Sequence, residues 1–371
     1  MNPIPAGFLV LALLALPARA QDCAPASWLR LDGARPGPVA PGELLDDAAR
    51  REVVLLGESH DDPDHHRWQL HTLAALHSRR PDMVLGFEAF PRRAQPVLDR
   101  WVAGELTQAE LLAETQWDEI WNVPAELYAP LFEFARLHRI PVVALNVERK
   151  LTQAVAEQGW DGVPQAEREG LSRPAPAPAP YREALARVHK EHESRAPLAG
   201  FIEAQQTWDR AMAEALARQP RTRLAVGIVG SGHLRHGHGV ALQLRDLGVR
   251  SIATLLPVEP AQCRSLAAGI ADAAFVLPTR AAQKAPPPRL GVQLAQEGEA
   301  VRLAGVVPGS LAERSGLKKD DVIAAAAGRP LKRVAELVAL VRAQPAGTWL
   351  PLEVKRGEAT QSLVVRFPPA P

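Results

Sequence analysis

The chain has 371 residues, of which 47% are hydrophobic and 23% charged, with 43 lysines and arginines against 42 aspartates and glutamates. This length is enough for about two domains with cores of their own, so collagen-like, fibrous and wholly disordered proteins are excluded. The formal net charge of +1 leaves no basic surplus for binding phosphates, and we therefore expect no nucleic-acid partner.

The first twenty residues predict an export signal. Phe8–Leu16 form an apolar stretch that is too short to span a bilayer, and Ala18-Arg19-Ala20 follows as a small-x-small cleavage pattern. Cleavage there would make Gln21 the mature N-terminus, and a buried core helix is the alternative interpretation. We expect a protein of the periplasm or cell envelope without a lipid anchor, because Asp22 before Cys23 is not the small residue that lipid-anchoring cleavage needs.

Beyond this segment, short apolar runs alternate with longer amphipathic stretches. The runs are apolar on both faces, which is typical of strands in a sheet covered by helices on both sides; they occupy residues 53–56, 83–87, 142–145, 224–229 and 251–256. Asp62-Pro63 offers a helix N-cap and first-turn proline, and predicts a helix to about Ser78. Helical periodicity also marks residues 93–114, 124–138, 181–193, 197–218 and 238–247. The alternation predicts an α/β domain, a three-layer sheet flanked by helices.

Two proline-rich stretches interrupt the chain. Pro174–Pro180 lacks the backbone donors for a helix or sheet interior and is expected to be an extended, polyproline-like surface loop. Gln283–Pro288 precedes a change to short strands around one helix, so the domain boundary is placed there. The predicted division is a signal peptide (1–20), an α/β domain (21–284) and a small C-terminal domain (285–371).

Two copies of Gly-x-x-His follow predicted parallel strands. They are Gly57-Glu58-Ser59-His60 and Gly230-Ser231-Gly232-His233, and a third strand runs into Gly86-Phe87-Glu88. Because α/β sheets bind ligands at the carboxyl ends of their strands, Glu58, His60, Glu88 and His233 are candidate acid, base or metal-ligand groups if these strands are neighbours. The alternative is a structural role in which they cap helices and satisfy buried backbone.

Other histidines lie close to the two motifs in sequence. His65 and His66 fall in the first turn of the helix after His60, where the positive end of the helix dipole favours a neutral, coordinating or base-like imidazole. His236 and His238 follow the second motif in a glycine-rich turn. They either line the site or are simply exposed.

Cys23 and Cys263 are the only cysteines of the chain. Export to an oxidising compartment predicts a single disulfide between them, and the alternative is two unrelated thiols.

The motifs in combination resemble a known family. Val53–His60, Asp62–Gln69, Gly86–Glu88, Leu127–Leu131 and Gly230–His233 together resemble the ChaN-like haem-binding proteins of bacteria, which belong to a group with the Tiki/TraB proteins and erythromycin esterases. The resemblance covers about residues 45–260. It implies haem bound between two protomers of a homodimer, with iron held by a tyrosine and the propionates met by histidine and lysine.

The chain has two tyrosines, Tyr128 and Tyr181, so the resemblance leaves few candidates for the iron ligand. Tyr181 is favoured because His189, Lys190 and His192 follow within three helical turns and could meet the propionates; a solvated helix face is their alternative interpretation. Phenolate oxygen suits ferric iron, which is a hard, highly charged centre. The candidate haem-binding residues are therefore Tyr181, Tyr128, His189, Lys190, His192, His65 and His66.

Residues 289–368 resemble a PDZ domain of the bacterial periplasmic type. Leu290-Gly291-Val292 resembles its carboxylate-binding loop, which captures the C-terminus of a protein or peptide by strand addition. Asp320-Asp321 stands where this family usually has Gly-Asp, and 324–328 replaces a more polar turn. We expect the fold to tolerate these changes and the peptide specificity to differ.

Two functions follow from these observations. The first is an envelope haem or iron-binding protein that serves iron uptake and recruits a partner through its PDZ domain. The second is a hydrolase of the Tiki or erythromycin-esterase type that uses Glu58, His60, Glu88 and His233, with a divalent metal bound by His60 and His233. The haem-binding protein is our prediction, and the hydrolase is the alternative.

Overall fold

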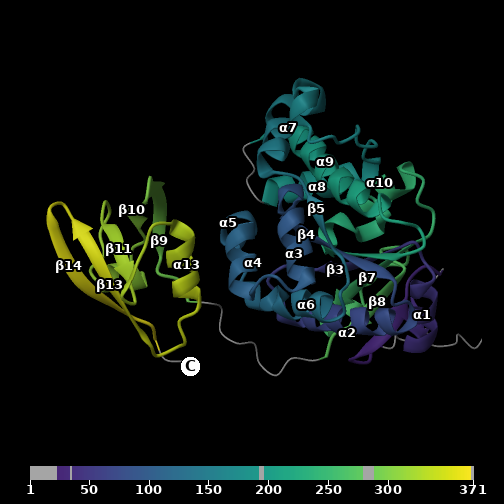
Figure 1. Cartoon of the computed structure of the whole chain (residues 1–371), viewed down its shortest axis with the longest axis horizontal. Coiled ribbons are helices and arrows are strands. Elements are labelled where there is room, and N and C mark those ends of the chain that lie inside the picture. The colour runs from purple at the N-terminus through teal and green to yellow at the C-terminus, as the bar shows by residue number, and fades with distance from the viewer. Residues whose placement is uncertain (1–22, 34–35, 192–195, 279–287, 369–371) are drawn as a thin grey trace, which may run out of the picture.

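The computed structural model describes residues 23–33, 36–191, 196–278 and 288–368. The predicted signal peptide, His192 and the predicted boundary after residue 284 lie outside these residues. Figure 1 shows two bodies, each built around a sheet of its own. Within the described ranges, no helix is both long and apolar enough to cross a membrane.

The first body contains an eight-stranded sheet in the order β2-β1-β8-β7-β3-β6-β4-β5. Six strands run parallel: β3 (Val53–Glu58), β4 (Met83–Pro91), β5 (Val142–Asn146), β6 (Leu224–Gly230), β7 (Ile252–Val258) and β8 (Ala273–Val276). β1 (Ser27–Arg30) pairs antiparallel with β8 and with β2 (Gly37–Val39). The five predicted strands are all present. β1, β2 and β8 are too short to show a pattern of their own in the sequence.

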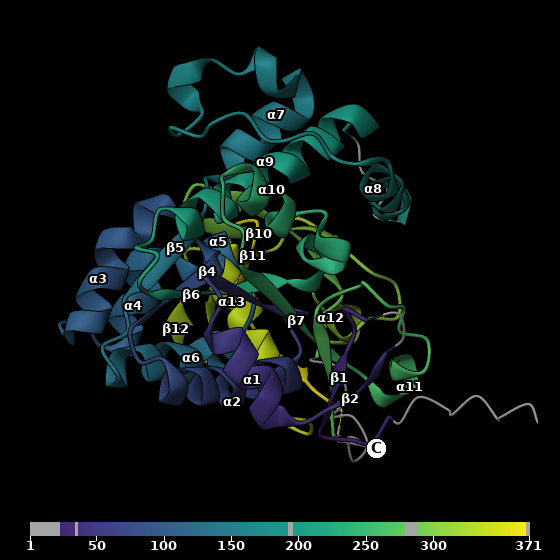
Figure 2. The same ribbon diagram turned by 90° about the vertical axis from the view of Figure 1, so that its right-hand side faces the viewer.

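Helices cover both faces of this sheet (Figure 2). One layer contains α1 (Pro41–Ala49), α2 (Pro63–Arg79), α3 (Gln95–Ala103), α4 (Gln108–Thr115), α5 (Trp117–Ile120) and α6 (Ala125–Leu137). The other contains α9 (Leu198–Ala217) and α10 (Val240–Asp246), and α7 (Arg149–Gly162) and α8 (Ala179–Glu191) pack on α9; α11 (Pro260–Cys263) is short. The predicted three-layer α/β fold is therefore confirmed.

Alternate residues of the central strand β3 enter different cores. Val54 and Leu56 pack in the core beneath α2 and α6, whereas Val53 and Leu55 pack with Met212 of α9 in the other. A strand that is buried on both faces must be apolar at every position, which explains why these strands appear in the sequence as continuous apolar runs.

Helix α2 begins where the sequence predicts. The Asp62 side chain accepts a hydrogen bond from the backbone N–H of Asp64, and Pro63 occupies the first helical position. Because α2 starts directly beyond the carboxyl end of β3, its first turn places His65 and His66 beside that edge of the sheet.

The proline-rich segment before α8 is extended, but its backbone is held in place. The N–H of Ala175 donates to Gln243 Oε1 at 2.8 Å, and Gln206 Nε2 donates to the Ala175 carbonyl at 2.7 Å. Helix α8 already begins at Ala179, with Pro180 in its first turn. The segment is thus pinned against α9 and α10 by side chains that replace the missing backbone partners.

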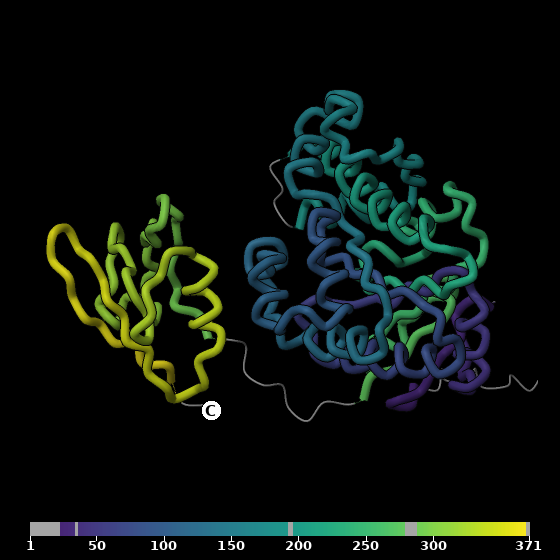
Figure 3. Tube along the Cα trace, viewed as in Figure 1, coloured from purple at the N-terminus to yellow at the C-terminus, as the bar shows by residue number. Residues whose placement is uncertain are grey.

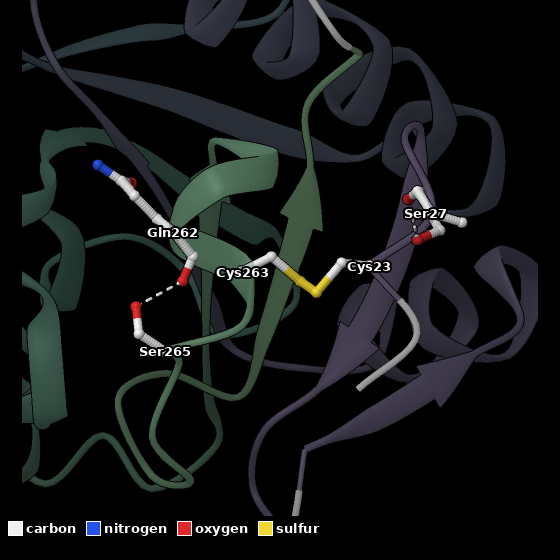
Figure 4. Close-up of a disulfide and its surroundings, with 6 residues drawn as sticks. Cys23, Ser27, Gln262, Cys263 and Ser265 are labelled. Atoms are coloured by element: carbon white, nitrogen blue, oxygen red, sulfur yellow. Dashed lines mark hydrogen bonds between the residues drawn. A yellow bond between two sulfur atoms is a disulfide. The ribbon is translucent and has the colours of Figure 1, made fainter. Parts of the chain in front are cut away.

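The predicted disulfide is present between Cys23 and Cys263, whose Cα atoms lie 5.9 Å apart (Figure 4). The bond joins the segment before β1 to α11, across a sequence separation of 240 residues. Figure 3 shows the N-terminal segment, in purple, beside the green segment that contains β8.

The second body is an antiparallel sheet with two helices. Its strands are β9 (Val292–Glu297), β10 (Ala300–Val306), β11 (Val322–Ala326), β12 (Arg329–Pro330), β13 (Trp349–Arg356) and β14 (Ala359–Arg366), and its helices are α12 (Leu311–Arg314) and α13 (Val334–Arg342). A separate core that includes Val301, Leu337 and Leu352 fills it. β9 ends the strand order, so one edge of it is not covered by another described strand.

The Asp320-Asp321 pair of this body has two different roles. Asp320 takes a left-handed backbone conformation with φ 71°, which favours glycine. Asp321 is fully buried and accepts hydrogen bonds from the Lys318 N–H at 2.8 Å and from Arg356 Nε at 2.7 Å. Asp321 therefore holds the turn before β11, whereas the backbone of Asp320 is strained.

We expect Asp320→Gly to stabilise the second body by about 0.5–1 kcal/mol, because glycine adopts this φ without a Cβ clash and the exposed Asp320–Arg302 ion pair contributes little. Urea unfolding of the full chain, followed by hydrogen exchange in β11 and β13, measures the change. Asp320→Ala is the control and should destabilise the same strands. A glycine variant no more stable than the wild type would contradict this assignment of strain.

Candidate active site

Three neighbouring strands bring the predicted site residues together. β6 lies between β3 and β4, and Glu58 at the end of β3 is level with Gly230 at the end of β6. Glu88 lies on β4. The strands are all parallel, so both Gly-x-x-His motifs and Glu88 meet at the carboxyl edge of the sheet, as the sequence predicts for adjacent strands.

The first histidine is held by a buried carboxylate. His60 Nδ1 donates to Glu58 Oε1 at 2.7 Å, and the phenol of Tyr128 on α6 donates to the same oxygen. The Trp121 ring meets the His60 ring edge-on at 4.5 Å between centroids. The His60 side chain keeps 36% of its surface exposed, while Glu58 and Tyr128 are buried. With Nδ1 bound to Glu58, the chemically available atom of His60 is Nε2.

The second histidine repeats this arrangement with residues from other elements. His233 Nδ1 donates to Asp209 Oδ1 on α9 at 2.7 Å, and the phenol of Tyr181 on α8 donates to Asp209 Oδ2 at 2.8 Å. The Trp208 ring lies 5.2 Å from the His233 ring between centroids. Each motif histidine thus contacts a carboxylate that also accepts a tyrosine hydroxyl, and each presents Nε2 as its remaining nitrogen.

Glu88 lies between the two units. It is 1% exposed, and its Oε2 accepts the backbone N–H of Gly230 at 2.6 Å. Its Oε1 makes no hydrogen bond within the described residues and lies 3.7 Å from His233 Nε2. A Cβ on Gly230 would come within 3.2 Å of His60 Nε2 and 3.4 Å of Glu88 Oε2. The absence of that carbon at Gly230 leaves the His60 ring room to lie beside Glu88.

A third imidazole, His66, has a polar neighbour at each ring nitrogen. Gln69 Nε2 donates to the Gly57 carbonyl and to Glu58 Oε2, so the amide oxygen must face His66 Nδ1, which lies 3.1 Å away. His66 Nε2 faces the His60 carbonyl at 2.9 Å. The His66 ring also lies beside the buried carboxylate, with Nδ1 3.5 Å from Glu58 Oε2.

These contacts shift the pKa values of the carboxylates and imidazoles in the site. Burial alone would raise the pKa of Glu58, but the hydrogen bond from His60 and the positive charges of His66 and His60 lower it overall. Burial likewise lowers the pKa of His60, and the hydrogen bond to Glu58 and the charge of Glu88 reverse that shift. The pKa of His233 is raised to about 9, because the charge and hydrogen bond of Asp209 outweigh burial.

Asp209 itself is fully buried, and burial raises its pKa. Asp209 and His233 therefore titrate as one unit. The carboxylate–imidazolium form is favoured because Glu88 places a second negative charge on the other side of the His233 ring.

Residues 44–244, more than half of the chain, match the family model described as haem-binding uptake, Tiki superfamily, ChaN. The chain belongs to this ChaN family. Residues 288–366 match the PDZ domain model.

One solved structure agrees with the α/β fold, and two others are similar in sequence to the C-terminal part. A ChaN of Campylobacter jejuni, described as binding haem cofacially, is 17% identical with a TM-score of 0.55, and the match covers 67% of this chain and 96% of that one. The HtrA3 PDZ domain bound to a phage-derived ligand is 24% identical over 21% of this chain and 82% of that one, with a TM-score of 0.20. The HtrA-type protease AlgW with a decapeptide is 21% identical, with a TM-score of 0.21. That match covers 22% of this chain and 29% of the AlgW chain. No curated protein matches the chain.

Iron ligation by tyrosine, implied by the resemblance to ChaN-like proteins, does not fit the arrangement of this ChaN-family chain. Tyr128 is 1% exposed and Tyr181 is 5% exposed, and each phenol donates its proton to a buried carboxylate. Burial, followed by the charge of Glu58 or Asp209, raises both tyrosine pKa values well above their ordinary value. As arranged here, neither tyrosine offers a phenolate to iron.

The residues predicted to meet the propionates lie further along α8. His189 is eight residues beyond Tyr181, about 12 Å along the helix, and its Nε2 donates to the Ala196 carbonyl at 2.7 Å. Lys190 is exposed. Neither of them makes a described contact with the two carboxylate–histidine units, and His192 lies outside the described residues.

His65 belongs to a different group. Its Nδ1 accepts the Ser59 backbone N–H at 2.7 Å, and ligand atoms of Asp62, His65 and Glu259 lie within 4.8 Å of one another. An imidazole that accepts at Nδ1 carries its proton on Nε2, the atom that faces Asp62 at 3.8 Å. This tautomer points an N–H toward Asp62, and it opposes metal binding at Nε2.

The loop that the sequence predicts to bind a carboxylate, Leu290–Val292, is held by its neighbours in the PDZ domain. Gly291 takes a φ of 78°, and a Cβ there would lie 2.3 Å from the Ser310 Cβ. The carbonyl of Leu290 accepts the Ala312 N–H at 2.8 Å, and that of Gly291 accepts the Val307 N–H at 2.9 Å. The loop is thereby fixed directly before the uncovered edge of β9.

Asp209, Gln69 and Trp121 were not anticipated from the sequence. Asp209 is one residue after Trp208, in a helix whose apolar stripe predicts core packing, and no spacing links it to His233. Gln69 is three residues after His66, and this i, i+3 separation is the one signal that could have indicated their contact.

We expect Asp209→Ala to lower the free energy of unfolding by about 3–5 kcal/mol, because it leaves His233 buried without its paired charge and leaves the Tyr181 hydroxyl without its acceptor. Urea unfolding followed by tryptophan fluorescence measures the loss. Asp161→Ala is the matched control, since the exposed Asp161–Arg173 pair is worth less than about 1 kcal/mol. Equal effects of the two substitutions would show that Asp209 and His233 do not form a buried ion pair.

Proposed function

We propose that the chain is an exported haem-binding protein of the ChaN type whose PDZ domain attaches it to the C-terminus of a partner protein. The observation that carries this proposal is the family match over residues 44–244, which spans both Gly-x-x-His motifs. The disulfide supports export, because such bonds persist in oxidising compartments. Binding of haem between two protomers, and a role in iron uptake, are part of the same proposal.

The PDZ domain supports the attachment through its edge strand. A peptide C-terminus would add a strand to β9 beside α13, with backbone N–H groups of Leu290, Gly291 and Val292 holding the carboxylate. β9 and α13 are neighbours in the domain, so side chains of the peptide would meet the helix. The side chains exposed on β9 and α13 would set which partner is bound.

Ferric haem titrated into the purified chain should give a saturable Soret band, since the family binds haem. The double variant Tyr128→Phe/Tyr181→Phe should keep that band, because both phenols are buried and hydrogen-bonded to carboxylates. Absorption spectroscopy measures both. Loss of the band in the double variant would show that a tyrosine binds the iron. The absence of any saturable band in the wild type would refute haem binding.

A divalent-metal hydrolase is the second candidate, and the unpartnered Glu88 Oε1 favours it. His60, Glu88 and His233 supply two imidazole nitrogens and one carboxylate oxygen, and Glu58 and Asp209 hold the Nδ1–H of each ring, as carboxylates commonly do behind metal-ligating histidines. Within the described residues, the group whose ligand atoms already lie within 4.8 Å of one another is Asp62, His65 and Glu259, so His60, Glu88 and His233 would have to draw closer together to hold an ion. When bound, such an ion supplies Lewis acidity and a more acidic water.

This candidate predicts about one Mn²⁺ or Zn²⁺ per chain after dialysis, with at least tenfold weaker binding in His233→Ala. Elemental analysis and calorimetry measure the metal, and a hydrolase screen measures activity. His71→Ala, an exposed residue of α2, is the control. Metal binding that is unchanged in both His60→Ala and His233→Ala would refute a metal centre at these residues. Hydrolysis that depends on neither residue would refute the hydrolase function.

A further inference from the structure

The edge of β9 that no other described strand covers is closed at one end by a side chain. Gln296, the fifth residue of this strand, accepts the Val334 backbone N–H through Oε1 at 2.9 Å and donates through Nε2 to the Lys332 carbonyl at 2.8 Å. Val334 is the first residue of α13, which lies beside β9 (Figure 1). Gln296 therefore links the strand to the start of the helix, at the end of β9 opposite the Leu290–Val292 loop.

Further bonds hold this end of β9 in place. Gln296 Nε2 also donates to the Gly298 carbonyl at 2.6 Å, in the turn between β9 and β10. Lys332 Nζ forms an ion pair with Glu299 of the same turn at 3.0 Å, and the Lys332 backbone N–H donates to Glu336 Oε2 at 2.9 Å. Each of these exposed bonds contributes little by itself. Together they tie the β9–β10 turn to the start of α13.

A bound C-terminus would run antiparallel to β9. The loop predicted to bind the carboxylate directly precedes the strand, so the last residue of a bound tail lies at the beginning of β9 and its earlier residues follow toward Glu297. Strand addition pairs the residues of the two strands one to one. The four residues Val292–Ala295 come before Gln296. Beyond them, a tail would have to occupy the place where the Gln296 amide reaches α13.

We propose that Gln296 limits recognition to the last four residues of the partner, the number that can pair with Val292–Ala295, and that it is thereby a specificity-determining residue of the PDZ domain. The inference rests on the proposed attachment to a partner's C-terminus. A longer tail pairs with the end of β9 only after the bonds from Gln296 to α13 have broken. The hydrogen bonds that such a tail gains are offset by those that Gln296 loses.

The test compares two peptide lengths on the full chain. The probe is an octapeptide selected from a displayed library of random C-terminal sequences, together with a tetrapeptide of its last four residues, and calorimetry measures both affinities. In the wild type, we expect the two peptides to bind within about twofold of each other. In Gln296→Ala, the octapeptide should bind at least about fivefold more tightly than the tetrapeptide, because the edge of β9 is then open to Glu297.

Controls separate this role from capping of α13. Loss of a cap lowers the free energy of unfolding, but it does not make affinity depend on peptide length. The tetrapeptide should bind Gln296→Ala as it binds the wild type, which shows that the domain is folded. Gln296→Thr repeats the comparison with a better strand former whose side chain is too short to reach α13. Gln361→Ala, on β14 at the other end of the strand order, should behave as the wild type.

The outcomes distinguish the inference from the function on which it rests. If the library yields no binder, or if the octapeptide still binds after its C-terminus is amidated, the proposed attachment is refuted. If the wild type binds the octapeptide at least about fivefold more tightly than the tetrapeptide, this inference is overturned while the attachment stands. The same holds if peptide length has no effect on affinity in Gln296→Ala and Gln296→Thr.

Discussion

Three carboxylates, those of Glu58, Glu88 and Asp209, are buried at the carboxyl edge of the α/β sheet, and the groups around them are arranged to compensate their charge. An isolated carboxylate in an apolar interior is costly unless it is paired and hydrogen-bonded. Two imidazoles and two phenols supply those bonds in two matched units, and the His66 ring lies beside Glu58. Of these three carboxylates, Glu88 is the one with an oxygen that has no hydrogen-bond partner among the described residues, and it lies between the two units.

The hydrogen bonds of Tyr128 and Tyr181 bear directly on whether either tyrosine can bind haem iron in this chain. A tyrosine that donates to a buried carboxylate stabilises the ionised carboxylate, and the same contact disfavours the phenolate that iron would need. As arranged here, the two tyrosines serve the buried carboxylates.

The sequence predicted the parts of this architecture that depend on local pattern. Strands buried on both faces are apolar throughout, and glycines at the ends of β3 and β6 mark the turns that carry His60 and His233. The partners of those histidines could not be predicted, because Asp209 becomes buried only when α9 is covered by neighbouring helices. In sequence, Asp209 and the nearby Arg210 and Glu214 look like one face of a solvated helix, yet all three are buried.

The edge of the α/β sheet is completed by residues from opposite ends of the domain. β1 begins at Ser27 and pairs with β8, which ends at Val276, and the Cys23–Cys263 bond ties the same two regions together. Contacts between such distant residues carry a large loop-closure entropy and form late in folding. The N-terminal strand must therefore remain unpaired until nearly the whole domain has been synthesised, and oxidation of the cysteines then makes its docking hard to reverse.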